Sequence, residues 1–429
     1  DFEGSDLIVA DGQTVTYGSP TLRFTHRTAR VTIVLTDYTE GLASVQLTGL
    51  STENGNPDII VPYDKGSNTY TAIVAPQSVA AGTTFITCTF TNGKVFVYKM
   101  KNATDWQAGG EYTYTVSLAA AKGYTIEDDG SYTVTSADGL MHVAELVNGG
   151  KTDINITLTA DIDLTGKDWT PIGTSFKNSY TGTFDGGGHT ITGLTVTTND
   201  KYAGLFGYIG NAGTVKNVVM EGVLITSNNG SSQAGGVAGF SRGTIENCSV
   251  SGSVSGTVYV GGVVGAQWGG SITGCSSSAT VKGTVDVGGV AGQTNSSATL
   301  TACYATGNVT LEIDPKKNIA GGGLVGMNAG SSLLACYATG NVTSTGSSTG
   351  KVHIGGFLGN NYTTVTACYW KNNHEQGIGY NRESTGATKV DGSVVTWQKA
   401  VDAMNTALQN AGSEWRYELK GALPTLRKQ

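Results

Sequence analysis

A glycine-rich pentapeptide recurs six times between about residues 201 and 370 of this 429-residue chain. Successive copies start 32, 26, 27, 34 and 33 residues apart, and a small apolar residue follows 13 to 15 residues after each start. A fixed period of this length is the signature of stacked supersecondary units, so it constrains the fold more than any other feature. The six copies start at Ala203, Gly235, Gly261, Gly288, Gly322 and Gly355.

The composition of each repeat predicts strands rather than helices. Short runs such as 250–254 and 258–260 alternate apolar with polar or small residues, which is the period of a β-strand. Clusters of Gly, Ser, Thr and Asn separate these runs and indicate turns. Stacked units would align their apolar side chains in columns roughly 4.8 Å apart, each buried side chain contributing about 1.5–3 kcal/mol. The repeats therefore predict an all-β fold containing a right-handed parallel β-helix.

Composition narrows the class of protein. Charged residues make up only 14% of the chain and the formal net charge is −7, which argues against nucleic acid and anionic membranes as partners. No apolar run approaches 18 residues, so no transmembrane segment is predicted. The chain opens at Asp1 without a signal-peptide pattern, as expected of a trimmed mature form or an expressed fragment. Richness in Thr, Ser, Gly and Val is typical of an extracellular all-β protein.

Five of the six cysteines occupy one repeat position. Neighbours in register would place their Cβ atoms about 4.8 Å apart, beyond the usual disulfide range of about 3.5–4.5 Å. A column also does not converge on one point, as a zinc site requires, so no metal is expected. We predict a buried structural column of free thiols acting as small apolar side chains. Its members are Cys248, Cys275, Cys303, Cys336 and Cys368.

Residues 1–118 form a separate predicted domain. About seven short strands with turn signals between them favour a two-sheet β-sandwich of immunoglobulin-like or transthyretin-like type. Asn92-Gly93, flanked by alternating runs, predicts a β-hairpin. The predicted strands are 21–24, 30–35, 43–47, 69–74, 83–89, 94–99 and 111–118.

Four segments of this domain resemble the landmark segments of fimbrillin-like proteins, in the same order and spacing. They are Asp6-Leu7-Ile8-Val9-Ala10, the stretch from Leu22 to Val31, Ile73-Val74-Ala75-Pro76-Gln77, and the stretch from Ala108 to Tyr114. Fimbrillin-like proteins are surface pilus and adhesin subunits of anaerobic Gram-negative bacteria. The resemblance implies fimbrial subunits as partners.

A second resemblance covers the rest of the chain. Residues 156–164, 169–173 and 184–194 are similar to the segment that leads into GLUG-motif β-helices, and the repeats after residue 201 resemble GLUG motifs themselves. Proteins with this combination are similar to adhesins that are secreted or anchored at the outer membrane of Gram-negative bacteria. The resemblance implies a cell-surface location and, as ligand, a glycan or a surface protein of a host or partner.

Short helices are predicted to cap both ends of the β-helix. Ser136–Asn148 carries apolar residues at helical spacing, with Ser136 as N-cap and Gly149 after the last turn. A second helix over 396–410 is expected to plug the opposite end, with Trp415 and residues 423–426 packed beside it. The predicted layout is a linker at 119–124 and a β-helix at 125–429, divided into cap and first coil (125–200), repeats (201–370) and C-terminal cap (371–429).

Strand alternation predicts where a ligand could bind. The residue after each column cysteine should point outward, which would place Tyr304, Tyr337 and Tyr369 in an exposed aromatic ladder on consecutive coils. Such a ladder with an asparagine rim could stack against sugar rings or a partner protein. The alternative is that the tyrosines only stabilise the stack or lie under the C-terminal segment.

Two other functions stay open. Parallel β-helices also host polysaccharide lyases and hydrolases, and hydrolysis needs two carboxylates about 5–10 Å apart. The acids of the repeats fall at different repeat positions, so we expect no paired site, no cofactor and no catalytic residue. An inert structural spacer of a surface assembly is the other alternative. The acids are Glu221, Glu246, Asp286, Glu312 and Asp314.

Overall fold

The computed structural model of the protein describes residues 7–18, 21–296, 298–383 and 386–429. The chain divides into two compact units, Asp1–Thr125 and Ile126–Gln429. Asp6, the first residue of the first fimbrillin-like segment, lies outside the described residues. Both units are built almost entirely of strands, which confirms the predicted all-β class.

The first unit is a β-sandwich, as predicted. Its two sheets enclose one apolar core that includes Val31, Ile33, Phe85 and Cys88. All strand pairs within the two sheets are antiparallel except the outer pair β12–β3, which is parallel. One sheet has the order β10 (Val95–Lys99), β9 (Thr84–Phe90), β4 (Leu42–Thr48), β5 (Ile59–Ile60), and the other β12 (Glu111–Ser117), β3 (Ala29–Thr36), β7 (Thr69–Val74), β6 (Tyr63–Gly66).

Alternation explains why these segments form strands. In β3 every second residue from Ala29 to Leu35 is buried, so one face meets the core. The hairpin at Asn92-Gly93 is confirmed: β9 and β10 are adjacent, and Gly93 adopts the positive φ of +82° that the turn requires. A short 3-10 helix, η2 (Thr52–Asn54), and the pair β8 (Gln77–Val79) and β11 (Thr104–Trp106) complete the unit.

One strand expected for this unit is wrong. The segment 21–24 makes no strand, and pairing begins one residue later, where β2 (Thr25–His26) meets β1 (Ile8–Val9). The predicted linker at 119–124 contains a helical turn, α1 (Ala119–Lys122), that ends at Gly123 with φ +96°. Leu118 and Ala119 are buried, so apolar burial holds this turn against the sandwich. β13 (Tyr124–Ile126) follows across the boundary between units.

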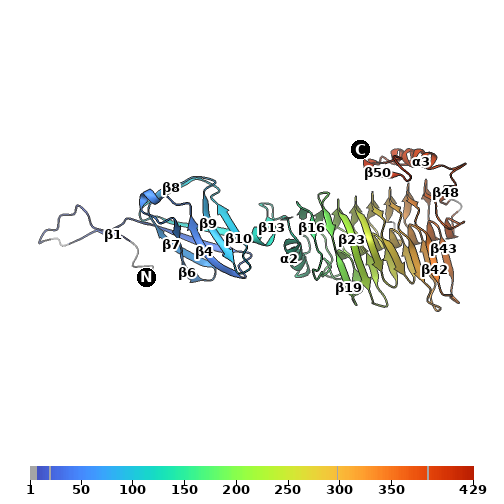
Figure 1. Cartoon of the computed structure of the whole chain (residues 1–429), viewed down its shortest axis with the longest axis horizontal. Coiled ribbons are helices and arrows are strands. Elements are labelled where there is room, and N and C mark those ends of the chain that lie inside the picture. The colour runs from blue at the N-terminus through green and yellow to red at the C-terminus, as the bar shows by residue number, and fades with distance from the viewer. Residues whose placement is uncertain (1–6, 19–20, 297, 384–385) are drawn as a thin grey trace. The chain divides into compact units, whose positions relative to one another are not determined.

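The second unit is a parallel β-solenoid of about seven turns. Figure 1 shows its strands stacked in register, coil upon coil, from β16 to β48. The coils contribute to four sheets, named A to D here. Sheet A contains β14 (Tyr132–Val134), β15 (Ile156–Leu158), β17 (Thr183–Asp185), β22 (Thr214–Lys216), β26 (Thr244–Glu246), β30 (Ser271–Thr273), β35 (Thr299–Thr301), β40 (Ser332–Leu334) and β45 (Val365–Thr366).

Sheet B is the most branched of the four because its longer loops add further strands. It contains β16 (Ile162–Asp163), β18 (Thr190–Thr192), β23 (Val219–Ser227), β27 (Ser249–Ser255), β31 (Ser276–Ser277), β36 (Tyr304–Ala305), β41 (Tyr337–Ala338), β46 (Tyr369–Trp370) and β48 (Thr388–Lys389), joined by β19 (Thr195–Thr198), β32 (Thr280–Gly283), β37 (Val309–Glu312) and β42 (Val342–Thr345).

Sheets C and D meet at the glycine-rich pentapeptides. Sheet C contains β20 (Tyr202–Ala203), β24 (Gln233–Gly235), β28 (Tyr259–Gly261), β33 (Asp286–Gly288), β38 (Ile319–Gly322) and β43 (Val352–Gly355). Sheet D contains β21 (Phe206–Ile209), β25 (Ala238–Ser241), β29 (Val264–Trp268), β34 (Ala291–Asn295), β39 (Val325–Asn328), β44 (Leu358–Asn361) and β47 (Ile378–Asn381).

Close approach between coils explains the repeated glycines. A Cβ added to Gly262 would lie 2.3 Å from the carbonyl oxygen of Gly289 on the next coil, so a side chain cannot be accommodated there. The apolar residue in the middle of each pentapeptide points inward instead, and Val263, Val290 and Leu324 are completely buried. The repeat therefore encodes a tight bend with one inward anchor per coil.

The N-terminal helix is confirmed. α2 spans Ala137–Asn148, and the Ser136 hydroxyl accepts a hydrogen bond from the backbone N–H of Gly139, as an N-cap does. Leu140, Val143 and Val147 form its buried face. Figure 1 shows α2 beside the first strands of the solenoid.

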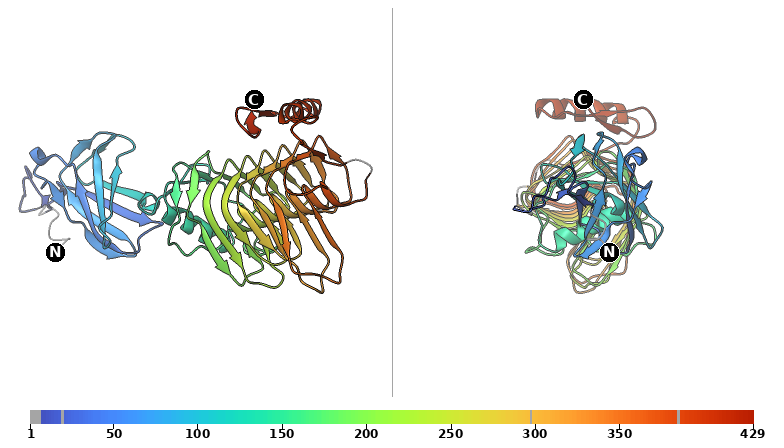
Figure 2. Two further views of the ribbon diagram at one scale, coloured as in Figure 1. Left: turned by 45° about the vertical axis from the view of Figure 1, so that its right-hand side comes forward. Right: turned by 90° about the vertical axis from the view of Figure 1, so that its left-hand side faces the viewer.

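The C-terminal segment does not plug the opposite end, which corrects the expectation for residues 371–429. α3 (Trp397–Asn410), β49 (Trp415–Glu418) and β50 (Thr425–Lys428) lie along the flank of the coils, as Figures 1 and 2 show. They share an apolar cluster with Ala302 and Ala335, which stand at tight turns between sheets A and B. Because these turn residues are small, the flank offers a shallow apolar surface on which the segment packs.

Candidate functional site

The five column cysteines are buried and free. The backbone N–H of Cys303 lies 3.4 Å from the Cys336 sulfur, and the same contact links Cys248 to Cys275 and Cys336 to Cys368. Burial raises the pKa of the Cys275, Cys303 and Cys336 thiols well above the ordinary value, so they remain protonated. The column therefore has a structural environment rather than a reactive one. Within the described residues, no group of three or more His, Cys, Asp or Glu side chains could hold a metal ion.

The tyrosine ladder exists, but the expectation that it is exposed is wrong. Tyr304, Tyr337 and Tyr369 pair in register, and the rings of Tyr304 and Tyr337 stack at 4.9 Å with 2° between their planes. Tyr337 is 0% exposed and Tyr369 9% exposed. The C-terminal segment covers the ladder: the Tyr337 hydroxyl donates a 2.5 Å hydrogen bond to the carbonyl of Pro424. Tyr304, at the border of the covered region, is the ladder residue that remains partly exposed.

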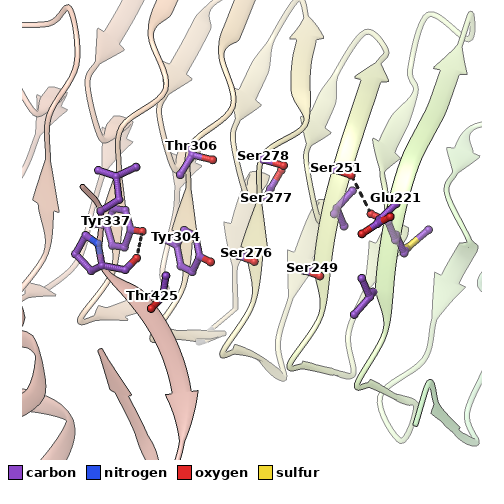
Figure 3. Close-up of a pocket in the computed structure, with 15 residues that line it drawn as sticks. Glu221, Ser249, Ser251, Ser276, Ser277, Ser278, Tyr304, Thr306, Tyr337 and Thr425 are labelled. Atoms are coloured by element: carbon purple, nitrogen blue, oxygen red, sulfur yellow. Dashed lines mark hydrogen bonds between the residues drawn. The ribbon is translucent and has the colours of Figure 1, made fainter. Parts of the chain in front are cut away.

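A groove of about 400 Å³ begins beside Tyr304 and runs along sheet B (Figure 3). The figure shows two rows of polar side chains on successive coils, which we call the hydroxyl groove. One row is Ser249, Ser276 and Tyr304, and the other is Ser251, Ser278 and Thr306.

The register of sheet B produces these rows. Val219 pairs with Ser249, Ser249 with Ser276, and Ser276 with Tyr304, so equivalent side chains recur at the strand spacing of roughly 4.8 Å. One face of the Tyr304 ring is occupied by Tyr337. Its other face is directed toward the Ser276 coil, where the small serine side chain leaves space. The groove therefore has a flat aromatic end and a hydroxyl-lined floor.

The C-terminal segment supplies one wall of the hydroxyl groove. Leu423, Pro424 and Thr425 line it, so its shape depends on the segment that buries Tyr337. Among the described residues that line the groove, Glu221 at the far end is the one ionisable carboxylate. Hydroxyl groups both donate and accept hydrogen bonds, so the groove suits a neutral ligand rich in hydroxyl groups.

A second surface, at the junction of sheets C and D, was missed in the sequence. Tyr208, Phe240 and Ala266 form an apolar cluster there with Tyr202, Tyr259 and Trp268. The sequence did contain a signal for this surface. The residue directly after each pentapeptide occupies one register column, and that column faces away from the solenoid core. That column continues from Ala266 through Gln293, Met327 and Asn360.

A sandwich followed by a parallel solenoid of glycine-bent coils defines a modular β protein of the kind that the two resemblances predict. Residues 1–135 match the family model described as fimbrillin-like. Residues 230–255 and 256–282 match the model described as the GLUG motif. The chain thus carries a fimbrillin-like N-terminal domain and GLUG motifs, which confirms both resemblances.

Two relatives match parts of this chain. The chain is 31% identical over 208 residues to halomucin of Haloquadratum walsbyi, covering 43% of this chain and 2% of halomucin. It is 39% identical over 97 residues to a candidate Gly-rich membrane protein of Evansella cellulosilytica, covering 22% of this chain and 11% of that one. The chain thus spans a small part of each of these relatives.

A crystal structure of a Bacteroides ovatus protein, assigned as a candidate immunoglobulin A1 protease, is similar with a TM-score of 0.53 and 20% identity. The similarity covers 70% of this chain and 93% of that one, and it shows a shared fold. Within the described part of this chain, no helix has the length and apolar character needed to cross a bilayer.

Proposed function

We propose that this is a non-catalytic, adhesin-like cell-surface protein that binds an extended glycan in the hydroxyl groove. The observation that carries the proposal is the alignment of serine and threonine hydroxyls on successive coils, ending at the half-open ring of Tyr304. The fimbrillin-like domain and the GLUG motifs support a location on the surface of a Gram-negative bacterium, secreted or anchored at the outer membrane. The names of two relatives, halomucin and a Gly-rich membrane protein, are consistent with a location at the cell surface.

The spacing of the hydroxyls matches a repeating ligand. Coils separated by roughly 4.8 Å offer a polar group at regular intervals, and a polysaccharide presents hydroxyl groups along its whole length. The apolar face of one sugar ring would stack on the open face of Tyr304. Each contact is weak, so useful affinity would come from several groove positions and several copies of the protein on one surface.

The groove chemistry supports binding without catalysis. Glycoside hydrolysis uses two carboxyl groups on either side of the scissile bond. Among its described lining residues the hydroxyl groove offers Glu221 alone, and the side chain of Glu221 is exposed to solvent. The fimbrillin-like domain would serve a separate task, connection to fimbrial subunits or to the cell surface.

A glycan array probed with the full chain tests the proposal. Ser276→Tyr would extend the tyrosine column by one coil and fill the groove, so we expect it to abolish glycan binding while leaving the melting temperature nearly unchanged. Tyr63→Ala, at an exposed tyrosine of the first unit, is the matched control and should bind as the parent does. Equal binding by Ser276→Tyr and the parent would contradict the proposal.

Two further assays distinguish the alternatives. Release of reducing sugar or unsaturated product from polysaccharides would identify a carbohydrate-active enzyme instead. Binding to a panel of host matrix proteins that Ser276→Tyr also abolishes would replace the glycan with a protein ligand in the same groove. A chain that binds neither panel would be a structural spacer.

A further inference from the structure

A pocket of about 370 Å³ lies at the junction of sheets C and D and is lined by four consecutive coils, the last three of which carry Asp286, Ala320 and His353. In sheet C, Asp286 pairs with Ala320, and Ala320 pairs with His353. The alanine has almost no side chain, so a space opens between the carboxyl group and the imidazole. Their backbones stand two strand spacings apart, roughly 9–10 Å. We call this space the Asp286 pocket.

Sheet D supplies the other side of the same three coils. Gln293, Met327 and Asn360 pair in register, each seven residues after Asp286, Ala320 and His353 respectively. In the first coil the Gln293 amide donates to the Asp286 carboxylate at 3.1 Å, and in the third coil His353 Nδ1 bonds to the Asn360 carbonyl oxygen. The middle coil places Ala320 and Met327 between these two polar pairs. Met327 therefore gives the pocket an apolar side, and the polar pairs form its two ends.

The polar ends are held in place by neighbouring rings. Trp268 Nε1 donates a 2.8 Å hydrogen bond to Gln293 Oε1, which orients the amide nitrogen toward Asp286. The ring of Tyr380 stacks on His353 at 5.1 Å with 17° between planes. Asp286 is only 5% exposed, so a carboxyl group lies almost completely buried at the end of an open pocket. Such a polar group, oriented by neighbours and directed into a pocket, is typical of a binding site.

Lys351 lines the rim of the pocket. Its backbone N–H donates to the Asn318 side chain, which positions the residue, and among the described residues its ammonium group takes part in no ion pair. The other titratable groups that line the pocket are Tyr259 and Tyr362, besides Asp286 and His353. The pocket therefore has a positively charged rim, amide and imidazole groups inside, and an apolar side at Met327. These features together suit an anionic ring with hydroxyl groups.

We propose that the Asp286 pocket binds a sugar residue that carries a carboxylate, such as a hexuronic acid, with the carboxylate at Lys351 and the ring hydroxyls at Asp286, His353 and Asn360. This site is distinct from the hydroxyl groove, which lies on sheet B, and it does not depend on the function proposed there. Binding at the two sites can therefore be tested separately.

The charge of Asp286 makes this binding depend on pH. Burial raises the pKa of the Asp286 carboxyl to about 7, although the hydrogen bond from Gln293 opposes the shift. Above this pH the carboxylate repels an anionic ligand, and below it the neutral carboxyl group can donate a hydrogen bond to a sugar oxygen. If the protonated form is the one that binds, affinity should increase about tenfold from pH 8 to pH 6.

Saturation-transfer NMR with the full chain tests the proposal, with methyl β-D-glucuronide as probe and methyl β-D-glucoside as its neutral counterpart. We expect the glucuronide to bind more tightly and with the pH dependence given above. Asp286→Asn, which imitates the neutral carboxyl, should bind the glucuronide equally at pH 6 and pH 8. Lys351→Met should lose about tenfold in affinity for the glucuronide, the order expected for a hydrogen bond to a charged group, and nothing for the glucoside.

Several outcomes would overturn the proposal. They are no detectable glucuronide binding, equal affinity for both glycosides, and a pH dependence that persists in Asp286→Asn. Acetate that binds as tightly as the glucuronide would show a simple anion site instead. Ser276→Tyr, which fills the hydroxyl groove, should leave glucuronide binding unchanged, and it separates failure at one site from failure at the other.

Discussion

The indole ring of Trp415 packs directly against the backbone of Gly274, so closely that a Cβ added to Gly274 would lie 2.2 Å from the ring. Gly274 adopts a φ of +65° at a turn between sheets A and B. The equivalent turn two coils earlier holds Asn217 and the next holds Asn247, linked by a 2.8 Å side-chain hydrogen bond. Asparagine tolerates this conformation well, so glycine at 274 reflects the C-terminal segment above it rather than the turn alone.

We therefore predict that Gly274→Asn displaces the C-terminal segment. The backbone conformation remains acceptable, but the new side chain occupies the position of the Trp415 ring, and overpacking of this kind costs about 1–3 kcal/mol. Limited proteolysis should cleave the variant after residue 390 faster than the parent, with a change in tryptophan fluorescence. Asn247→Gly, at the adjacent turn, is the control and should leave the segment protected. Equal proteolysis rates for Gly274→Asn and the parent would mean that the segment is not held by this contact.

The cysteine column predicts unreactive thiols. All six cysteines are buried, and burial raises the pKa of Cys88 to about 12 and that of three column thiols well above the usual range. Thiolate is the reactive form, so a thiol-specific reagent at pH 8 should label the native protein extremely slowly. In denaturant all six thiols should react at once. Rapid labelling of two or more thiols in the native state would contradict a close-packed column.

Most of the fold of the second unit was predictable from the repeat. The period of the repeat predicted the stacked coils. Strand alternation predicted that the cysteines lie inside and that Tyr304, Tyr337 and Tyr369 form one column. These properties are local, since they depend on the spacing of residues within one coil and its neighbours. The sandwich was predictable for the same reason, from alternation in segments such as β3.

Long-range packing could not be predicted. Nothing in the spacing of 396–410 says whether an amphipathic helix covers the end of a solenoid or its flank. Which of the two positions the helix takes depends on small residues at Gly274, Ala302 and Ala335, which are separated from the helix by more than sixty residues in the chain. For that reason the exposed tyrosine ladder was predicted incorrectly. The sequence predicted no site at Asp286, because the acids of the repeats fall at different repeat positions. A pocket forms there nevertheless, because the next two coils carry Ala320 and His353 at the same position, and the small alanine leaves space beside the carboxyl group.

The last prediction concerns stability and pH. The pKa of Asp286 is about 7 in the folded protein and near its ordinary value of 3.8 in the unfolded chain. Between about pH 4 and pH 7 the native state therefore binds more protons at this residue than the unfolded chain does. This residue's contribution to the free energy of unfolding must decrease as pH rises through that interval and remain constant above it.

Asp286→Asn should remove this decrease in the free energy of unfolding with rising pH. An amide has no charge to desolvate, and its oxygen can still accept the hydrogen bond from Gln293. The variant should equal the parent in stability near pH 4 and exceed it at pH 8 by roughly 4 kcal/mol, at about 1.4 kcal/mol for each pKa unit. Denaturant unfolding of both proteins at pH 4, 6 and 8 measures the difference, in which the other titrating groups cancel. A difference that stays constant with pH, or a variant less stable at pH 8, would show that Asp286 is ionised in the native protein and that its surroundings stabilise the charge.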